Sequence, residues 1–214
     1  IPLNSIPPAT FNIRPAIAVT GNNSLVAVWD QNSDIFGQRF TVTGNTLGSP
    51  FKIDARDASE NSPVIAANSS GQFVVAWTYN SSGTSYTRLR HFNEDGSPRH
   101  EDSSFIGISN PSGIQLMLNN DRRANVVWSS SDSWEDRSYI SGSHLRDDGY
   151  TLRSFTVDRT EPGDGSHVFP PSAEADANGR FVVAWRRRDP DKNDRVLARE
   201  YDENSQPIGP IHTL

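Results

Sequence analysis

The sequence predicts an all-β protein made of four similar units, because one short, mostly apolar phrase that ends in tryptophan occurs four times. The phrase occupies residues 25–29, 73–77, 124–128 and 181–185. Its tryptophans are 48, 51 and 57 residues apart, and a period near fifty residues indicates repetition of one supersecondary unit. No segment shows the periodicity of an amphipathic helix.

The second copy shows what one unit contains. An apolar run at 63–67 and the repeated phrase at 73–77 are separated by the turn sequence 68–71. A third, alternating run at 86–92 is followed by Glu-Asp-Gly at 94–96. Apolar runs separated by such turn residues are typical of β-hairpins, and Asp-Gly is among the strongest hairpin signals. Each unit is therefore predicted to be a four-stranded antiparallel meander.

The other copies follow the same template. First strands are expected at 15–19, 114–118 and 171–175, and third strands at 35–40, 139–145 and 196–201. Fourth strands carry the spaced apolar pairs Phe51 and Ile53, Phe155 and Val157, and Ile211 and Leu214, with a degenerate version near 105–108.

The repeated phrase is apolar at both strand parities, so it is expected to be covered on both faces. Third strands such as 36–40 are more polar. Burial that falls from inner to outer strands is typical of sheets standing radially around an axis, which is the β-propeller layout. The predicted fold is a β-propeller of four four-stranded antiparallel blades, one per repeat. The alternatives are a larger ring completed by another chain and an open stack.

The predicted organisation is an N-terminal arm at 1–14 and one propeller domain at 15–214. Its blades are expected at about 15–54, 63–108, 113–158 and 171–214. In the arm, Phe11 and Ile13 resemble an additional outer strand. This strand would either cover its own ring or pair with an exposed edge of another subunit, and it is the expected route of self-association.

Composition excludes several classes. The net charge of −6 argues against non-specific attraction to nucleic acid. No apolar run reaches the eighteen or so residues that cross a bilayer, so no membrane insertion is expected. No charged-then-apolar leader is present, which indicates a mature or excised segment, or a cytosolic one. The chain has no cysteine, which excludes disulfide scaffolds and thiolate sites.

The motifs resemble a repeat common in large secreted or surface proteins of bacteria, in which a Val-Val-Ala-Trp strand is followed by Gln-Arg-Phe and Asp-x-x-Gly segments. The residues that carry the likeness include Trp29, Gln38, Arg39 and Phe40 in the first copy, Trp77, Arg90, Phe92, Asp95 and Gly96 in the second, and Trp185, Arg199, Tyr201 and Asp202 in the last. The resemblance implies an extracellular or cell-surface location and no particular reaction.

Trp134 is the one tryptophan outside the repeat pattern, in a polar loop. The carboxylates of Asp132, Glu135 and Asp136 lie beside it in sequence. An aromatic ring that stacks on a sugar, with carboxylates that accept its hydroxyls, is one interpretation of this loop. A tryptophan that covers a gap is the other.

A second loop spaces oxygen-bearing side chains at alternate positions, as calcium loops do. Its candidate ligands are Asp189, Asp191, Asn193 and Asp194. The loop lacks the glycine and the downstream glutamate of a complete calcium motif. Because arginines at 186–188 precede it, a solvated network of ion pairs is the alternative to a Ca²⁺ site.

These observations lead us to expect a non-catalytic extracellular module that binds glycan or protein, or mediates adhesion, through its loops. The first alternative is a structural subunit of a filament or surface array linked by the N-terminal strand. The second is a glycan-active enzyme. No recognisable nucleophile motif is present, although carboxylates from distant repeats can meet in space as an acid–base pair.

Overall fold

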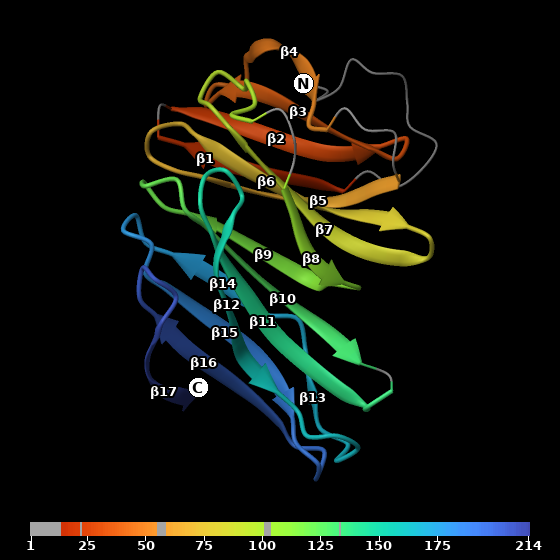
Figure 1. Cartoon of the computed structure of the whole chain (residues 1–214). Coiled ribbons are helices and arrows are strands. Elements are labelled where there is room, and N and C mark those ends of the chain that lie inside the picture. Colours follow the sequence, from red (N-terminus) through yellow and green to blue (C-terminus); the bar gives the residue numbers. More distant parts are fainter. Residues whose placement is uncertain (1–13, 22, 55–58, 101–103, 133) are drawn as a thin grey trace. The chain divides into compact units, whose positions relative to one another are not determined.

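A computed structural model describes residues 14–21, 23–54, 59–100, 104–132 and 134–214. Strands are the regular structure of this part of the chain, and they form four antiparallel sheets, one for each repeat (Figure 1). The chain folds into two compact units, and the boundary between them follows Ile108. Each unit contains two of the sheets. No helix among the described residues is long and apolar enough to cross a membrane.

The first unit contains the sheets of repeats one and two, and in each sheet the strand order follows the chain. The first sheet consists of β1 (Pro15–Thr20), β2 (Ser24–Gln31), β3 (Asp34–Thr41) and β4 (Thr46–Lys52). The second consists of β5 (Ser59–Ala67), β6 (Phe73–Ser81), β7 (Thr84–Phe92) and β8 (Ser104–Ser109).

The second unit contains the sheets of repeats three and four. The third sheet consists of β9 (Ser112–Leu118), β10 (Ala124–Asp132), β11 (Arg137–Leu145) and β12 (Thr151–Arg159). The fourth consists of β13 (His167–Val168), β14 (Ser172–Ala175), β15 (Phe181–Arg188), β16 (Asp194–Tyr201) and β17 (Pro207–Thr213).

The first strand of the last repeat is interrupted. Both β13 and β14 pair with β15, one with each half of it. Pro170 and Pro171 lie between the two pieces, and proline cannot donate a hydrogen bond to a β-ladder. The sequence predicted only the second piece, because β13 lies before these prolines.

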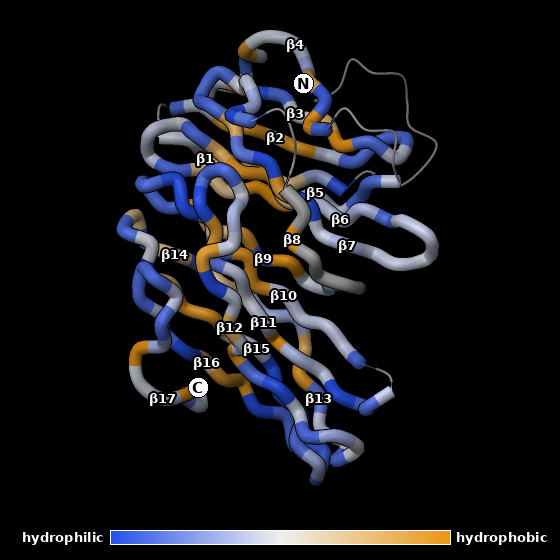
Figure 2. Tube along the Cα trace, viewed as in Figure 1, coloured by the Kyte–Doolittle hydropathy of each residue, from blue (hydrophilic) through white to orange (hydrophobic). Residues whose placement is uncertain are grey.

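The cores consist mainly of the repeated strands. Figure 2 shows the strongly apolar stretch of β2, and in β6 the whole run from Phe73 to Trp77 is buried. The expectation that this strand is covered on both faces is wrong for β15, where Val182 is 43% exposed while Val183 is fully buried. Val182 lies directly between Glu174 and Glu200 on its neighbouring strands, and these charged neighbours keep that face solvated.

Two glycines in third strands lie directly beneath phenylalanine rings of fourth strands. Gly37 of β3 pairs with Phe51, and Gly142 of β11 pairs with Phe155. A Cβ added at Gly142 would lie 2.3 Å from the Phe155 ring, whereas one at Gly37 would lie 2.9 Å from the Phe51 ring. The rings therefore occupy the space over the glycines and pack into the core between the sheets.

We expect Gly142→Ala to destabilise the protein by about 1–3 kcal/mol, because overpacking forces the ring of Phe155 out of its site. Gly37→Ala is the matched control. There the weaker clash is offset by the roughly 0.5–1 kcal/mol that alanine gains over glycine in a strand. Urea denaturation of both variants measures the difference. Equal stabilities for the two variants would contradict this explanation.

Candidate functional site

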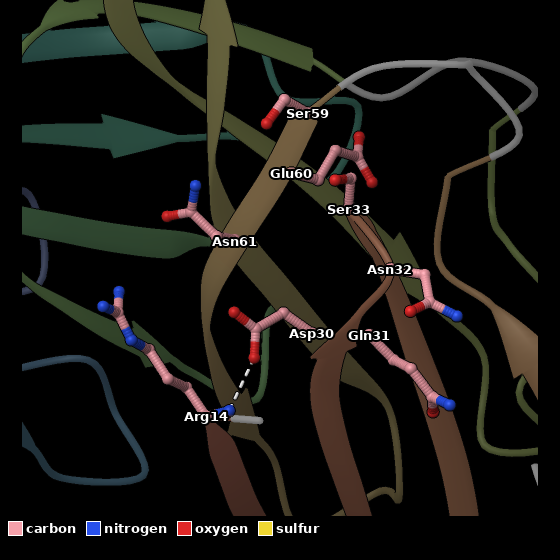
Figure 3. A pocket seen from close by; sticks show the side chains of 8 residues that line it. All are labelled: Arg14, Asp30, Gln31, Asn32, Ser33, Ser59, Glu60 and Asn61. Carbon is pink, nitrogen blue, oxygen red and sulfur yellow. Dashed lines mark hydrogen bonds between the residues drawn. The ribbon is translucent and has the colours of Figure 1, made fainter. Parts of the chain in front are cut away.

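A polar pocket of about 260 Å³ lies in the first unit, where three segments converge (Figure 3). The first segment is the residue that precedes β1, the second is the turn from β2 into β3, and the third is the start of β5. The lining residues are Arg14, Asp30, Gln31, Asn32, Ser33, Ser59, Glu60 and Asn61. None of them is apolar, so the pocket suits a ligand rich in hydrogen-bonding groups.

Local backbone chemistry shapes two walls of this pocket. Asn32 and Ser33 form a two-residue hairpin loop with positive φ angles of 53° and 68°, as a type I′ turn requires. In β5 the register shifts between Asn61 and Val64, and Ser62 in this bulge has φ 54°. Bulges bend a strand and re-aim its side chains. The backbone N–H of Glu60 donates to the Ser33 carbonyl at 2.9 Å, which joins the two walls.

Glu60 is the electrostatically unusual residue of the pocket. Its side chain is 2% exposed, and its Oε1 accepts a hydrogen bond from Nε1 of Trp77 at 2.8 Å. Its Oε2 has no hydrogen-bond partner among the described residues. Burial raises the pKa of Glu60 to about 7, an effect that Trp77 partly opposes and that Asp54 and Asp34 reinforce. The group therefore changes charge close to neutral pH.

The last repeat provides an internal comparison. Nε1 of Trp185 donates to Oδ2 of Asp158 at 2.7 Å, as Trp77 does to Glu60. Oδ1 of Asp158, however, pairs with the guanidinium of Arg187 at 2.7 Å. The tryptophan–acceptor bond is thus a structural feature of the repeat, and what distinguishes Glu60 is that no cation among the described residues pairs with it.

Asp30 and Arg14 complete the charged groups of the pocket. Oδ1 of Asp30 accepts a hydrogen bond from the backbone N–H of Arg14 at 2.5 Å, and the Asp30 side chain is buried. The Arg14 guanidinium donates to the Ser62 hydroxyl, which itself donates to Oδ1 of Asn61 at 3.0 Å. All three residues line the cavity. In Figure 3 the Asp30 carboxylate points toward the backbone nitrogen of Arg14, and the Glu60 carboxyl group lies beside Ser33.

The loop predicted to bind a sugar lies elsewhere, at the turn between β10 and β11. Trp134 is 97% exposed there, and its backbone N–H donates to Oδ1 of Asp132 at 2.9 Å. Glu135 pairs with Arg137 at 3.2 Å, and Asp136 adopts a turn conformation with φ 47°. The proposed sugar contacts of this loop remain a prediction.

In the loop predicted to bind calcium, arginines pair with two of the candidate carboxylates. Asp189 pairs with Arg195 at 2.6 Å and Asp194 pairs with Arg188 at 3.0 Å. The hydrogen bond from Arg195 lowers the pKa of Asp189. Within the described ranges, no group of three or more His, Cys, Asp or Glu side chains could hold a metal ion.

The remaining two predicted ligands of that loop, Asp191 and Asn193, bond to each other at 2.7 Å. The structure therefore supports the alternative of an ion-pair network over a Ca²⁺ site. Phe11 and Ile13, the residues of the predicted interface strand, lie outside the described residues.

Sequence reasoning missed the three charged residues of the pocket. Asp30 directly follows the first repeat's tryptophan, where the other copies have Thr78, Ser129 and Arg186. Glu60 lies just before the proline at which its strand was predicted to begin. The sequence signal for Asp30 was that an acidic residue follows the tryptophan in only one of the four repeats. Its meaning became clear only from the residues that lie near it in space.

No family model matches the sequence, and no curated protein matches it either. Solved structures do match. The endo-arabinase from Bacteroides thetaiotaomicron VPI-5482 is 12% identical with a TM-score of 0.56, over 94% of this chain and 80% of that one. The Penicillium chrysogenum alpha-L-arabinanase complexed with arabinobiose is 13% identical with a TM-score of 0.64, over 94% and 66%. The GH43_1 enzyme from Xanthomonas citri is 11% identical with a TM-score of 0.54, over 94% and 72%.

The chain has a β-propeller fold. The neighbours are propellers of glycoside hydrolases and related enzymes, and the four antiparallel sheets agree with the fold class that the repeats predicted. Of the resemblance to bacterial surface repeats, the neighbours support the propeller-type fold, and the specific repeat remains a prediction.

The comparisons correct the functional expectation. The sequence led us to expect a non-catalytic binding or adhesion module and no enzyme, and this expectation is wrong because the structural neighbours are glycoside hydrolases. That expectation relied on the absence of a local catalytic motif, and such an absence does not exclude a glycosidase, whose two acids come from distant segments.

Glu60 makes stability depend on pH in a defined direction. Its pKa in the folded protein is about 7, against an ordinary value of 4.5, so between these values the folded state holds more protons than the unfolded state. The contribution of Glu60 to stability is therefore fully present below pH 4.5 and is lost as the pH rises through 7. The loss attributable to Glu60 is about 2 kcal/mol, less than the whole shift implies because water reaches the adjacent pocket.

Urea denaturation at pH 5 and pH 8 measures this effect. Glu60 makes the free energy of unfolding lower at pH 8 than at pH 5, and we expect E60Q to lose most of this difference. E174Q, which changes an exposed glutamate of the second unit, keeps the wild-type difference. An E60Q variant with the full wild-type pH dependence would show that Glu60 is not the group responsible.

Proposed function

We propose that this chain is a glycan-active enzyme, a glycoside hydrolase whose reaction site is the pocket between Arg14, Asp30 and Glu60. The observation that carries the proposal is Glu60, a buried carboxyl group that holds its proton close to neutral pH in a polar cavity. Glycosidases need such an acid beside a second, ionised carboxylate. Asp30 lines the same cavity.

The structural neighbours support this proposal. They include two arabinan-degrading enzymes and a family 43 glycoside hydrolase. Because the chain spans 80%, 66% and 72% of those three chains, their activities are a guide to reaction class and not to substrate. A glycan substrate also agrees with the extracellular or cell-surface location that the repeats imply, which we retain as part of the proposal.

In the proposed reaction, Glu60 acts as the general acid. Its proton moves to the glycosidic oxygen as the bond from that oxygen to the anomeric carbon breaks. A water molecule attacks the anomeric carbon and loses a proton to Asp30. The indole N–H of Trp77 remains bonded to Oε1 of Glu60 and stabilises the carboxylate that forms, because a donor to a carboxylate favours its charged form.

The remaining lining residues suit sugar hydroxyls. Ser33 and Ser59 offer hydroxyl groups, and Asn32 and Asn61 offer amides that can donate and accept. The cavity of about 260 Å³ lies below the roughly 300–1,000 Å³ of pockets for drug-sized ligands. It therefore suits one sugar ring at a chain end or branch better than a long stretch of polysaccharide.

Release of reducing sugar from arabinan, xylan, galactan, pectin and sialylated oligosaccharides tests the proposal. We expect turnover of at least one of these glycans and a loss of about 10²–10⁴-fold in kcat for E60Q, the range typical of general acid catalysis. The amide oxygen of the new glutamine can still accept the Trp77 hydrogen bond, so the structural part of the interaction is kept.

D158N is the matched control, because Asp158 makes the same tryptophan bond outside the pocket. Once corrected for any loss of folded protein by circular dichroism, D158N should keep wild-type kcat. Equal losses in both variants would mean that Glu60 acts only as a structural acceptor. No hydrolysis of any glycan in the panel would refute the assignment of a glycoside hydrolase.

A further inference from the structure

We propose that the pocket selects a sugar that carries a carboxylate, and that the Arg14 guanidinium is the group that recognises it. This inference rests on the proposed function, since it names the substrate class of the same pocket. It concerns a specificity-determining residue rather than the reaction itself.

The charges around the pocket motivate the inference. Arg14 is the one cation among the residues that line the cavity. Its guanidinium bonds to the Ser62 hydroxyl and forms no ion pair with an acid among the described residues. Arg187, Arg188 and Arg195 of the second unit, in contrast, all pair with aspartates. Arg14 is thus a cation at a polar cavity with capacity left for an anion.

The direction of the guanidinium is set by the irregular start of β5. Ser62 lies in the bulge with a left-handed backbone, and its hydroxyl accepts from Arg14 and donates to Asn61. This chain of two hydrogen bonds holds the guanidinium and the Asn61 amide in fixed relation to each other. A prearranged donor loses less freedom on binding than a mobile one.

Guanidinium chemistry selects the ligand. Its planar fork of five N–H groups matches a carboxylate with two parallel, charge-assisted hydrogen bonds, and only one of its nitrogens is used by Ser62. The Asp30 carboxylate, which receives the Arg14 backbone N–H, balances the cation. The guanidinium is the one positively charged group that lines the cavity, so an entering carboxylate would pair with it.

Two kinds of acidic sugar present this chemistry, a uronic acid and a sialic acid. Isothermal titration of E60Q, which should leave the probes intact, distinguishes them. The probes are digalacturonic acid against its methyl ester, and 3′-sialyllactose against lactose. We expect at least one acid to bind tenfold or more tightly than its neutral counterpart, and we expect sodium chloride to weaken the binding of that acid only.

Substitution of Arg14 in the same background tests the role of this residue. R14Q should bring the acid-to-neutral affinity ratio close to one, and R14K should keep part of the preference because it keeps the charge without the fork. R146Q is the control, since Arg146 is an exposed arginine bonded to Asp148 outside the pocket. It should leave the ratio unchanged.

The outcomes separate this inference from the proposed function. Arg14-dependent binding of an acid without hydrolysis of any glycan would support the inference and refute the enzyme. A second outcome is hydrolysis of neutral glycans together with an acid-to-neutral affinity ratio near one, both in the E60Q parent with Arg14 and in the R14Q variant. This outcome would refute the inference and would still support the proposed glycoside hydrolase. Absence of binding by all four probes at millimolar concentration would also overturn the inference.

Discussion

The structure depends on burying the tryptophan of each repeated phrase, and three of these tryptophans donate their indole N–H to a nearby side chain. A buried N–H without an acceptor costs stability, so each such tryptophan needs an acceptor close by. Trp29 uses the amide of Gln31, Trp77 uses Glu60 and Trp185 uses Asp158. The repeat keeps the donor and varies the acceptor. A buried acceptor beside these tryptophans therefore follows from packing, and in the second and fourth repeats that acceptor is a carboxyl group.

Much of the fold could be predicted from sequence because its determinants are local. Turn residues and strand periodicity are read within a few positions, and they placed the four meanders correctly. The errors have non-local causes. Strand β5 begins four residues before Pro63 because Ser62 adopts a left-handed backbone that lets the chain continue into the ladder. Val182 is exposed because the strands beside it present glutamates, which the sequence of β15 itself cannot reveal.

The site was harder to predict for the same reason. The calcium-like loop looked promising because alternate oxygens are visible in six consecutive residues, yet Arg195 and Arg188 occupy its carboxylates from the two strands of the same hairpin. Arg14, Asp30 and Glu60 are far apart in sequence and belong to no motif. Only the pairing of β1 with β2 and of β5 with β6, together with the bond from Glu60 to Ser33, assembles them.

Comparison of the repeats explains how a structural acceptor can acquire chemistry. In the second unit Arg187 pairs with one oxygen of Asp158 and Trp185 donates to the other, so both oxygens are occupied. Glu60 keeps the tryptophan bond without a cation, and burial then favours its protonated form. The Arg14 guanidinium likewise has no acid partner among the described residues. The ion pair that holds Asp158 has no counterpart at Glu60 or Arg14 among the described residues, and a polar ligand can bond to groups that lack such a pair.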